Sequence, residues 1–129
     1  MTANGSASTT SRYICPAPSV VASAIAHRTT AIRIGTAIVF LPHHDLIRLA
    51  EDYAMVDLLS GGRLDFGVGR GFLKATYDGF NQAMGESRER FQEGLEIITR
   101  AWTQETFSYG SSLRNGSDQA EKKAARALL

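Results

Sequence analysis

Apolar residues recur at helical spacing in three stretches of the chain. The first stretch predicts a short helix that Ser19 caps and that ends near Arg28. The second predicts the most regular helix of the chain, which stops at Ser60-Gly61-Gly62. The third predicts a helix capped by Ser87. The predicted apolar faces of the three helices are Val20, Val21, Ala24 and Ile25; Leu46, Leu49, Ala50, Tyr53 and Val56; and Phe91, Leu95, Ile98 and Trp102.

Two stretches between these helices have the composition of strands. Ile32 to Phe40 is continuously apolar and β-branched, which predicts a strand that is covered on both faces and ends at Pro42. The run from Arg63 to Val68 alternates polar and apolar residues and predicts a second strand. Strands that alternate with amphipathic helices predict an α/β fold with parallel strands and right-handed crossovers. Ligands of such folds bind at the carboxyl ends of the strands.

The remaining segments carry weaker patterns. Residues 1–15 are rich in Ser, Thr, Ala and Gly, which predicts a disordered leader before a domain at 16–110. A loop of about fifteen residues follows Phe72, and a loop of that length at a strand end is more often functional than structural. Residues 111–129 form a polar, Ala-rich tail, in which Ser117 or Asp118 is expected to cap a weak helix.

Composition and charge exclude several classes of function. The 129 residues carry a formal net charge of +1, which gives no long-range attraction to nucleic acid or to anionic membranes. The single cysteine, Cys15, excludes an internal disulfide and is typical of a reducing compartment. No window has the roughly 20 apolar residues of a membrane span, and no secretory signal begins the chain. We therefore expect a soluble, cytoplasmic protein with no nucleic-acid or membrane partner.

The stretch from Asp65 to Phe72 carries the strongest chemical signal. Gly67, Gly69 and Gly71 alternate around Arg70, so a ligand could approach the backbone closely where no Cβ obstructs it. The planar guanidinium of Arg70 suits two phosphate oxygens. The alternative interpretation is a tight turn in which Arg70 is only an exposed charge. A dinucleotide-binding unit is disfavoured, because its glycines run straight into a helix, whereas here the helix follows only after about fifteen residues.

His43 and His44 lie at the end of the first predicted strand, before Asp45. We expect no metal site, because adjacent residues rarely ligate the same ion and the chain offers no second cluster of ligands. One of the two histidines is a candidate general acid or base, although an exposed turn histidine is the commoner outcome. The turns at His43 and Arg70 are expected at the same edge of the sheet, so they could share one pocket.

Several motifs follow one another in a characteristic order between about Ser19 and Tyr109. Taken together, they identify a resemblance to the bacterial luciferase-like flavin-dependent monooxygenases. The motifs are Arg33-Ile34-Gly35-Thr36-Ala37, Leu41-Pro42, Arg48-Leu49-Ala50-Glu51-Asp52, Leu58-Leu59-Ser60-Gly61-Gly62-Arg63, Phe66-Gly67-Val68-Gly69-Arg70-Gly71, Ser87-Arg88 and Trp102.

This resemblance implies a partial TIM (β/α)8 barrel, in which the chain supplies about two parallel strands with their helices. It also implies an oxidoreductase of the monooxygenase type, which uses reduced flavin and dioxygen to transfer an oxygen atom to a small organic substrate. The implied cofactor is FMN, with a deazaflavin as the alternative that related branches use. A flavin reductase is an implied partner, and pairing into a homodimer or heterodimer is compatible with the resemblance.

The resemblance also implies roles for particular residues. Arg70 and Arg88 match arginines that contact the FMN phosphate, and Phe72 matches a loop residue near the flavin. Ala37-Ile38 matches a non-prolyl cis peptide behind the isoalloxazine ring. Gly69 stands where luciferase has a reactive cysteine, so light emission is not expected. The implied cofactor-binding residues are Ala37, Ile38, Gly69, Arg70, Gly71, Phe72 and Arg88.

The resemblance covers only part of a barrel. A complete barrel takes roughly 250 residues, so we expect the chain to be a fragment of a longer product. The alternative to a working enzyme is a catalytically silent, truncated remnant, or a non-catalytic subunit that pairs with another barrel through its helices. Stoichiometric binding of flavin to the purified chain would exclude a silent remnant.

Overall fold

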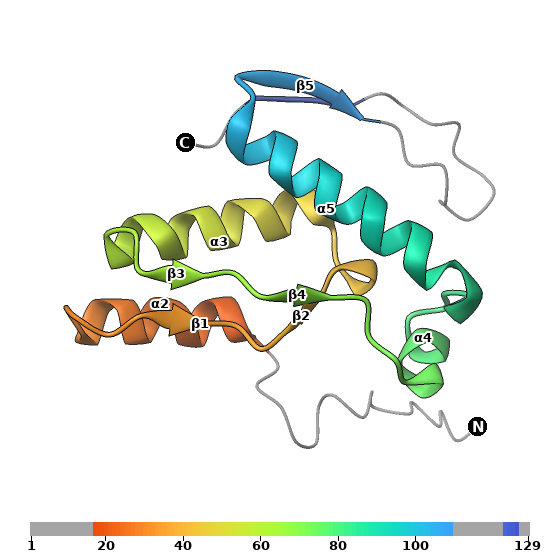
Figure 1. Ribbon diagram of the computed structural model, residues 1–129, viewed down its shortest axis with the longest axis horizontal. Helices are drawn as coiled ribbons and strands as arrows, with labels where there is room; N and C mark the ends of the chain where they lie inside the picture. Colours follow the sequence, from red (N-terminus) through yellow and green to blue (C-terminus); the bar gives the residue numbers. More distant parts are fainter. Residues whose placement is uncertain (1–16, 110–122, 127–129) are drawn as a thin grey trace, which may run out of the picture.

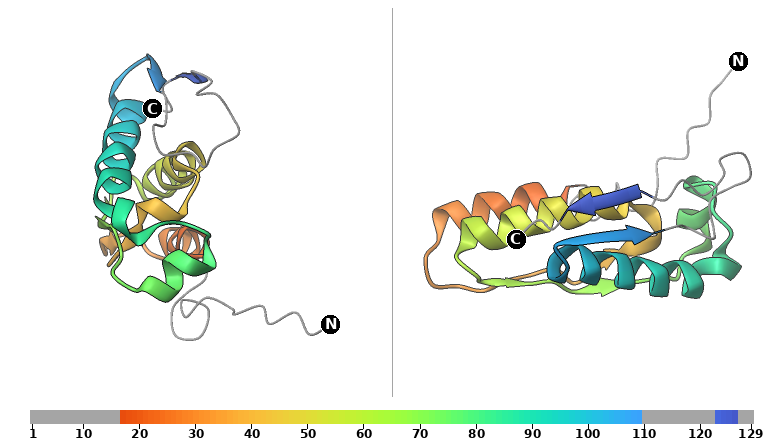
Figure 2. Two further views of the ribbon diagram at one scale, coloured as in Figure 1. Left: turned by 90° about the vertical axis from the view of Figure 1, so that its right-hand side faces the viewer. Right: turned by 90° about the horizontal axis from the view of Figure 1, so that it is seen from above.

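The computed structural model describes residues 17–109 and 123–126, in which helices pack beside short parallel strands (Figure 1). Helices α2 and α3 lie together on one side of the strands, and α5 packs across α3, as the two views of Figure 2 show. The elements are α2 Pro18–Arg28, β1 Ile34–Gly35, β2 Val39–Phe40, η1 Leu41–His43, α3 Leu46–Ser60, β3 Leu64–Asp65, β4 Val68–Gly69, α4 Lys74–Gly79, η2 Met84–Glu86, α5 Ser87–Thr103, β5 Thr106–Tyr109 and β6 Lys123–Arg126.

The parallel arrangement of the strands confirms the predicted α/β class. Strand β1 pairs with β3, with Ile34 opposite Leu64, and β2 pairs with β4, with Val39 opposite Val68. Each predicted strand is therefore divided into two short segments. Between its paired segments the first strand has one residue more than the second, so the pairing is interrupted near the Ala37-Ile38 peptide.

One face of the strands is open, which corrects the expectation that the first strand is covered on both faces. Ile34 and Val39 are buried toward the helices, whereas Gly35, Ala37 and Ile38 are exposed. The continuous apolar run was misleading, because within residues 17–109 only one layer of helices covers the strands. A continuous apolar run is therefore not sufficient to predict that both faces of a strand are buried.

Helix α3 forms as the sequence predicts. The carboxylate of Asp45 accepts hydrogen bonds from the backbone N–H groups of Ile47 and Arg48, both at 3.1 Å, which caps the start of the helix. Gly61 ends the helix in the left-handed conformation, at φ 67°. The predicted apolar face is confirmed for its buried members Leu49, Ala50, Tyr53 and Val56, and Leu46 is half-buried.

Helix α2 buries the opposite face from the predicted one. Ala22 and Ala26 are buried, whereas Val20 keeps 66% of its surface exposed and Val21 and Ile25 are also exposed. Small side chains allow α2 and α3 to approach closely, and this packing outweighs the larger apolar area of the valine face. The Ser19 cap was also wrong, because the hydroxyl of Ser19 donates to Asp52 of α3 at 3.0 Å.

Two details of α5 differ from the prediction. Ser87 is the first residue of the helix, buried and without a capping bond, so it is not the N-cap. Leu95 is 44% exposed, and Gly94, Ile97 and Ala101 fill the interface instead, together with Ile98. Gly94 takes that place because a Cβ there would lie 3.1 Å from Leu46 and 3.3 Å from Leu41. The predicted core positions of Phe91 and Trp102 are confirmed, since both pack against the buried cluster.

The segments outside the core also correct two expectations. The predicted loop after Phe72 contains the helix α4 and the 3-10 turn η2. In the predicted tail, residues 123–126 form strand β6, antiparallel to β5, and not a helix. The leader and the expected cap at Ser117 or Asp118 lie outside the described residues. Among the helices that the structure describes, none combines the length and the apolar character that a membrane crossing requires.

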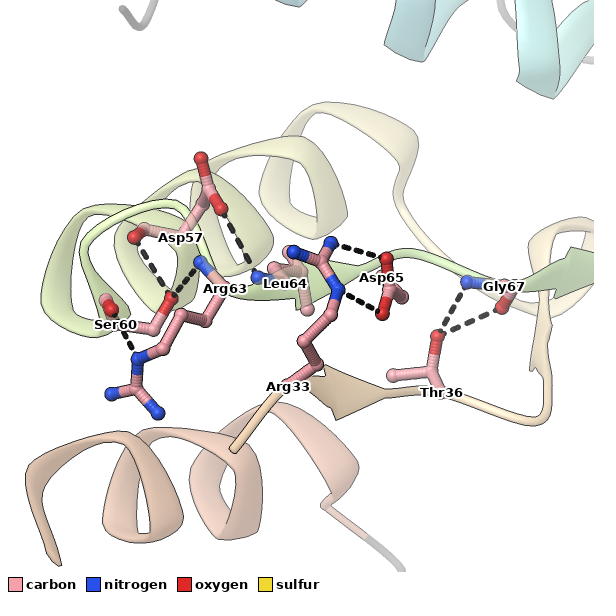
Figure 3. Close-up of polar contacts among 8 residues, drawn as sticks. All are labelled: Arg33, Thr36, Asp57, Ser60, Arg63, Leu64, Asp65 and Gly67. Carbon is pink, nitrogen blue, oxygen red and sulfur yellow. Dashed lines mark hydrogen bonds and ion pairs between the residues drawn. The ribbon is translucent and has the colours of Figure 1, made fainter. Parts of the chain in front are cut away.

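Arg63 joins the ends of α2 and α3 through its whole side chain. Its Nε donates to the Ser60 carbonyl at 2.6 Å, at the end of α3 (Figure 3). Its two terminal nitrogens donate to carbonyl oxygens in the last turn of α2 and in the segment that follows this helix. These acceptors are Ala26 O at 3.1 Å, Thr29 O at 2.8 Å and Ile32 O at 2.7 Å, and the Thr29 hydroxyl accepts as well, at 3.1 Å. The arginine of this motif is therefore structural.

We expect Arg63→Met to lower the free energy of unfolding by about 2–4 kcal/mol, because it leaves several carbonyl oxygens without a donor. Arg33→Met is the matched control, because Arg33 also forms a bidentate bond, to Asp65, but at an exposed position. It should change stability little. Urea unfolding followed by circular dichroism measures both, and equal losses for the two variants would contradict the structural role of Arg63.

Candidate functional site

The ends of β2 and β4 lie at one edge of the molecule, as the sequence predicts. In Figure 1 both strands point to the right, toward α4 and the start of α5. A Cβ on Gly71 would lie 3.6 Å from His43 Nε2 and 3.5 Å from the Phe40 ring, so the two turns are in contact. A small cavity of about 10 Å³ lies between them, lined by Phe40, His43, Gly71, Phe72, Leu73 and Thr76.

His43 is held by its ring and by one hydrogen bond. The ring stacks on Phe80 at 4.9 Å between centroids and meets Tyr77 edge-on at 4.5 Å. Its Nδ1 lies 2.9 Å from Oε1 of Gln82. Its Nε2 is buried and, within the part of the chain that the structure describes, has no hydrogen-bond partner. Burial lowers the pKa of His43, and the bond to Gln82 opposes this shift.

His44 differs from its neighbour. Its side chain is exposed and is not part of the cavity wall, so the structure brings His43 and not His44 to the Arg70 turn. The pKa of His44 is lowered, first by partial desolvation and then by the positive charge of His43, while Asp52 opposes the shift. Neither histidine contacts an acidic side chain that would orient it as a general base, among the hydrogen bonds of the described residues.

Tyr77 connects the Arg70 turn to the first turn of α5. Tyr77 is completely buried, and its hydroxyl donates to the backbone carbonyl of Arg70. Burial raises the pKa of the Tyr77 phenol, and a side-chain hydrogen bond with Ser87 and the charges of Arg70 and Arg90 act in the opposite direction. The buried position of Ser87 follows from this contact. Sequence analysis did not identify Tyr77, because its place depends on the fold of α4.

Arg70 and Arg88 both carry exposed side chains. Within residues 17–109 neither forms an ion pair, whereas Arg33, Arg48, Arg90 and Arg100 each pair with a carboxylate. Arg88 lies in the first turn of α5, directly after Ser87. The two charges are therefore available to an anion, and α5 adds the positive end of its dipole.

The glycines of the turn also have a packing role within the chain. A Cβ on Gly67 would lie 2.0 Å from the Thr36 carbonyl oxygen, and a Cβ on Gly69 would lie 2.1 Å from Cδ1 of Ile38. The Thr36 hydroxyl also exchanges two hydrogen bonds of 2.9 Å with the backbone of Gly67 (Figure 3). Close approach to the neighbouring strand thus requires Gly67, whereas a Cβ at Gly69 would require only the tip of the Ile38 side chain to shift. Gly71 is required by its backbone, at φ 77°.

The open face of the strands carries the other candidate residues. The Ala37-Ile38 peptide is cis in the structure, as the family resemblance implies. Ile38 is 49% exposed beside Gly69, and Phe72 is 73% exposed at the strand ends. These apolar surfaces flank the Arg70 turn. Among the described residues, no group of three or more His, Cys, Asp or Glu side chains is placed to hold a metal ion.

Comparison with known proteins decides the family. The sequence model of the family described as luciferase-like monooxygenase matches residues 5–124. The chain belongs to the luciferase-like monooxygenases. The oxygenase component of a flavin-dependent trigonelline monooxygenase from Acinetobacter baylyi is 33% identical over 91 residues, which cover 69% of this chain and 25% of that relative. The chain spans about a quarter of the length of the curated relatives it matches.

Solved structures of luciferase-like monooxygenases show the same fold. Monooxygenase RslO1 from Streptomyces bottropensis matches with a TM-score of 0.76 and 33% identity, over 87% of this chain and 32% of that chain. The oxygenating constituent of 3,6-diketocamphane monooxygenase from Pseudomonas putida, solved with FMN, matches with a TM-score of 0.71 at 22% identity, over 87% and 29%. The fold is therefore part of a TIM barrel, which confirms the predicted architecture.

Substitutions at the glycines test the contact between the strands. Gly67→Ala should lower the free energy of unfolding by about 3 kcal/mol or more, because its Cβ meets a backbone oxygen. Gly69→Ala should cost only about 1–2 kcal/mol, because the tip of Ile38 can move, and Ile38→Ala in the same chain should recover most of that loss. Gly79→Ala, where a Cβ meets nothing within 4 Å, is the control. Urea unfolding of these four variants and of Ile38→Ala alone gives the complete cycle, and additive losses for the Gly69 and Ile38 substitutions would contradict the contact.

Acidification should destabilise the fold through His43 and His44. Both pKa values are lowered from 6.5 in the folded chain, so the unfolded chain binds more protons just below pH 6.5. Their contribution is complete above that pH and is lost as the pH falls toward the folded values. The urea midpoint should therefore drop between about pH 7 and pH 5.5, and His43→Asn should reduce the slope. An unchanged slope in this variant would contradict the burial of a neutral His43.

Proposed function

We propose that this chain forms the phosphate-binding part of a flavin site, at residues 16–110, in a monooxygenase that acts on a small organic substrate. The observation that carries the proposal is the junction at the strand ends. Tyr77 joins the Arg70 turn to the start of α5, and this junction leaves Arg70 and Arg88 without carboxylate partners among the described residues. A phosphate dianion satisfies such a site through charge-assisted hydrogen bonds.

The residues present fit the phosphate end of FMN. Arg70 offers a planar fork on an exposed side chain, and Gly71 turns the backbone directly after it with a positive φ. The 17-residue helix α5 starts beside this loop, so the positive end of its dipole favours an anion at the same place. Arg88 adds a second positive charge within the first turn. As part of the same proposal, we assign Gly69 and Gly71 to the cofactor-binding residues of this loop.

The apolar surface beside the phosphate site suits the ring of the cofactor. Ile38 and Phe72 are exposed next to the Arg70 turn, and apolar side chains there would orient a flat ring and exclude water from one of its faces. When bound, reduced flavin supplies the reaction with dioxygen. FMN is favoured over a deazaflavin because the related trigonelline monooxygenase is flavin-dependent and the camphane monooxygenase was solved with FMN.

Reduced flavin must reach this site from another protein. The related Acinetobacter protein is the oxygenase component of its monooxygenase, and we extend this organisation to the present chain. The proposed partner is therefore a separate flavin reductase. A cytoplasmic location is part of the proposal, because the single cysteine of the chain is typical of a reducing compartment.

A second candidate function is a non-catalytic subunit that pairs with another barrel segment. Exposed apolar residues favour this alternative, because α2 and α3 leave a surface that packs against nothing in residues 17–109 and 123–126. These residues are Val20, Val21 and Ile25 on α2, and Met55, Leu58 and Leu59 on α3.

The first proposal predicts that FMN binds to the purified chain and that Arg70→Ala weakens binding about tenfold or more, the scale of one charge-assisted contact. Arg33→Ala removes the same charge at the opposite end of the strands and should leave the affinity within about twofold. Fluorescence titration with oxidised and reduced FMN measures both. The absence of saturable binding to the unmodified chain would overturn the proposal and favour the pairing subunit.

A further inference from the structure

Gln82 fixes the tautomer of the neutral His43 ring. The amide nitrogen of Gln82 donates to the Pro42 carbonyl at 2.6 Å, so its Oε1 must be the atom that faces His43. An amide oxygen only accepts, and His43 Nδ1 is therefore the donor in their 2.9 Å bond. In a neutral ring this leaves the lone pair on Nε2, the buried atom that faces the small cavity beside Gly71.

The same contacts tie two distant parts of the chain together. Pro42 and His43 belong to the 3-10 turn η1 that follows β2, whereas Tyr77, Phe80 and Gln82 belong to the segment that follows the Arg70 turn. Gln82 bonds to both residues of the strand end, and the rings of Tyr77 and Phe80 pack on the His43 ring from two directions. Tyr77 in turn donates to the carbonyl of Arg70. A continuous set of contacts thus leads from His43 to the backbone of Arg70.

We propose that His43 and Gln82 form a latch that positions the Arg70 turn for phosphate binding. In this proposal His43 is a positioning residue, because its ring packs on Tyr77, Phe80 and Gly71, whereas Arg70 and Arg88 carry the charges for the anion. The effect of the latch on phosphate binding rests on the proposed flavin function. The contacts of the latch itself belong to this chain alone. It predicts that flavin affinity depends on the protonation of a residue that does not touch the flavin.

Protonation of His43 would destabilise this latch at Nε2, whereas the Nδ1–H bond to Gln82 persists and favours the charged ring. A second proton on Nε2 places a charged donor in a cavity whose wall is mostly apolar and in which the buried Nε2 has no acceptor among the described residues. Among the described residues, the titratable and charged groups placed near the ring are Tyr77, which faces it from α4, His44, which adjoins it in the chain, and Arg70, which precedes the glycine that the ring contacts. None of these offers a negative charge at neutral pH that would stabilise the imidazolium.

Two substitutions separate the hydrogen bond from the titration. His43→Phe keeps a ring for Tyr77 and Phe80 but removes the donor to Gln82. His43→Asn keeps a donor near the position of Nδ1 and cannot titrate. His44→Asn is the matched control, because it removes the adjacent, exposed histidine. The complete 129-residue chain is used throughout.

The first measurement needs no flavin. In the chain labelled with ¹⁵N-histidine, NMR should show that His43 carries its proton on Nδ1 and titrates below its ordinary pKa of 6.5. Amide exchange at Gly71 and Phe72 should accelerate about tenfold in His43→Phe, and it should remain unchanged in His44→Asn. A proton on Nε2, or equal exchange in all variants, would overturn the latch.

The second measurement is FMN affinity as a function of pH. The affinity of the unmodified chain should fall between about pH 7.5 and pH 5.5 at least threefold more than that of His43→Asn, since protonation reduces the competent fraction. Protonation of the FMN phosphate affects both chains equally and cancels in this ratio. FMN binding with identical pH profiles would overturn the latch and leave the proposed function intact. Failure of FMN to bind the unmodified chain would overturn the proposed function, while amide exchange still decides the latch.

Discussion

The close approach of the two strands at Thr36 and Gly67 is the contact on which the rest of the arrangement depends. The Thr36 carbonyl fills the place of a side chain at 67, and the Thr36 hydroxyl exchanges hydrogen bonds with the Gly67 backbone. This contact sets the register of the strand segments on both sides. The register then brings His43 and Gly71 to the same edge. The glycine-rich motif is thus first a packing device, and the anion site is built at its end.

Arginines of this chain divide into two groups with different physical roles. Arg63 is turned inward, where its fork satisfies the carbonyl oxygens at the ends of two helices. Arg70 and Arg88 are turned outward and, within the described residues, have no carboxylate partner. All three residues are arginines, and the groups around each one determine whether it is structural or available to a ligand. A motif that contains an arginine therefore indicates chemistry only once the acceptors around that arginine are known.

Local signals in the sequence predicted helix α3, because its apolar spacing and the glycine stop at Gly61 both act within a turn or two of the chain, whereas the cap by Asp45 became evident only in the structure. The carboxyl-end rule for parallel strands also predicted that His43 and the Arg70 turn meet. The buried face of α2 could not be predicted in this way, because close packing on α3 selected alanines over valines. Tyr77, Gln82 and the buried Ser87 were missed for a related reason. Their roles depend on where α4 carries them, and no periodic pattern records that path.

The single tryptophan of the chain lies at the junction of these layers. Trp102 donates its indole N–H to the Ala50 carbonyl at 3.1 Å and packs edge-on against Phe66, at 5.2 Å between ring centroids. Phe66 in turn contacts Tyr53 on α3. The fluorescence of this indole therefore reports on the packing of helices α3 and α5 against the second strand. Because indole emission overlaps flavin absorption, energy transfer from Trp102 would measure the separation between this junction and a bound cofactor in the unlabelled protein.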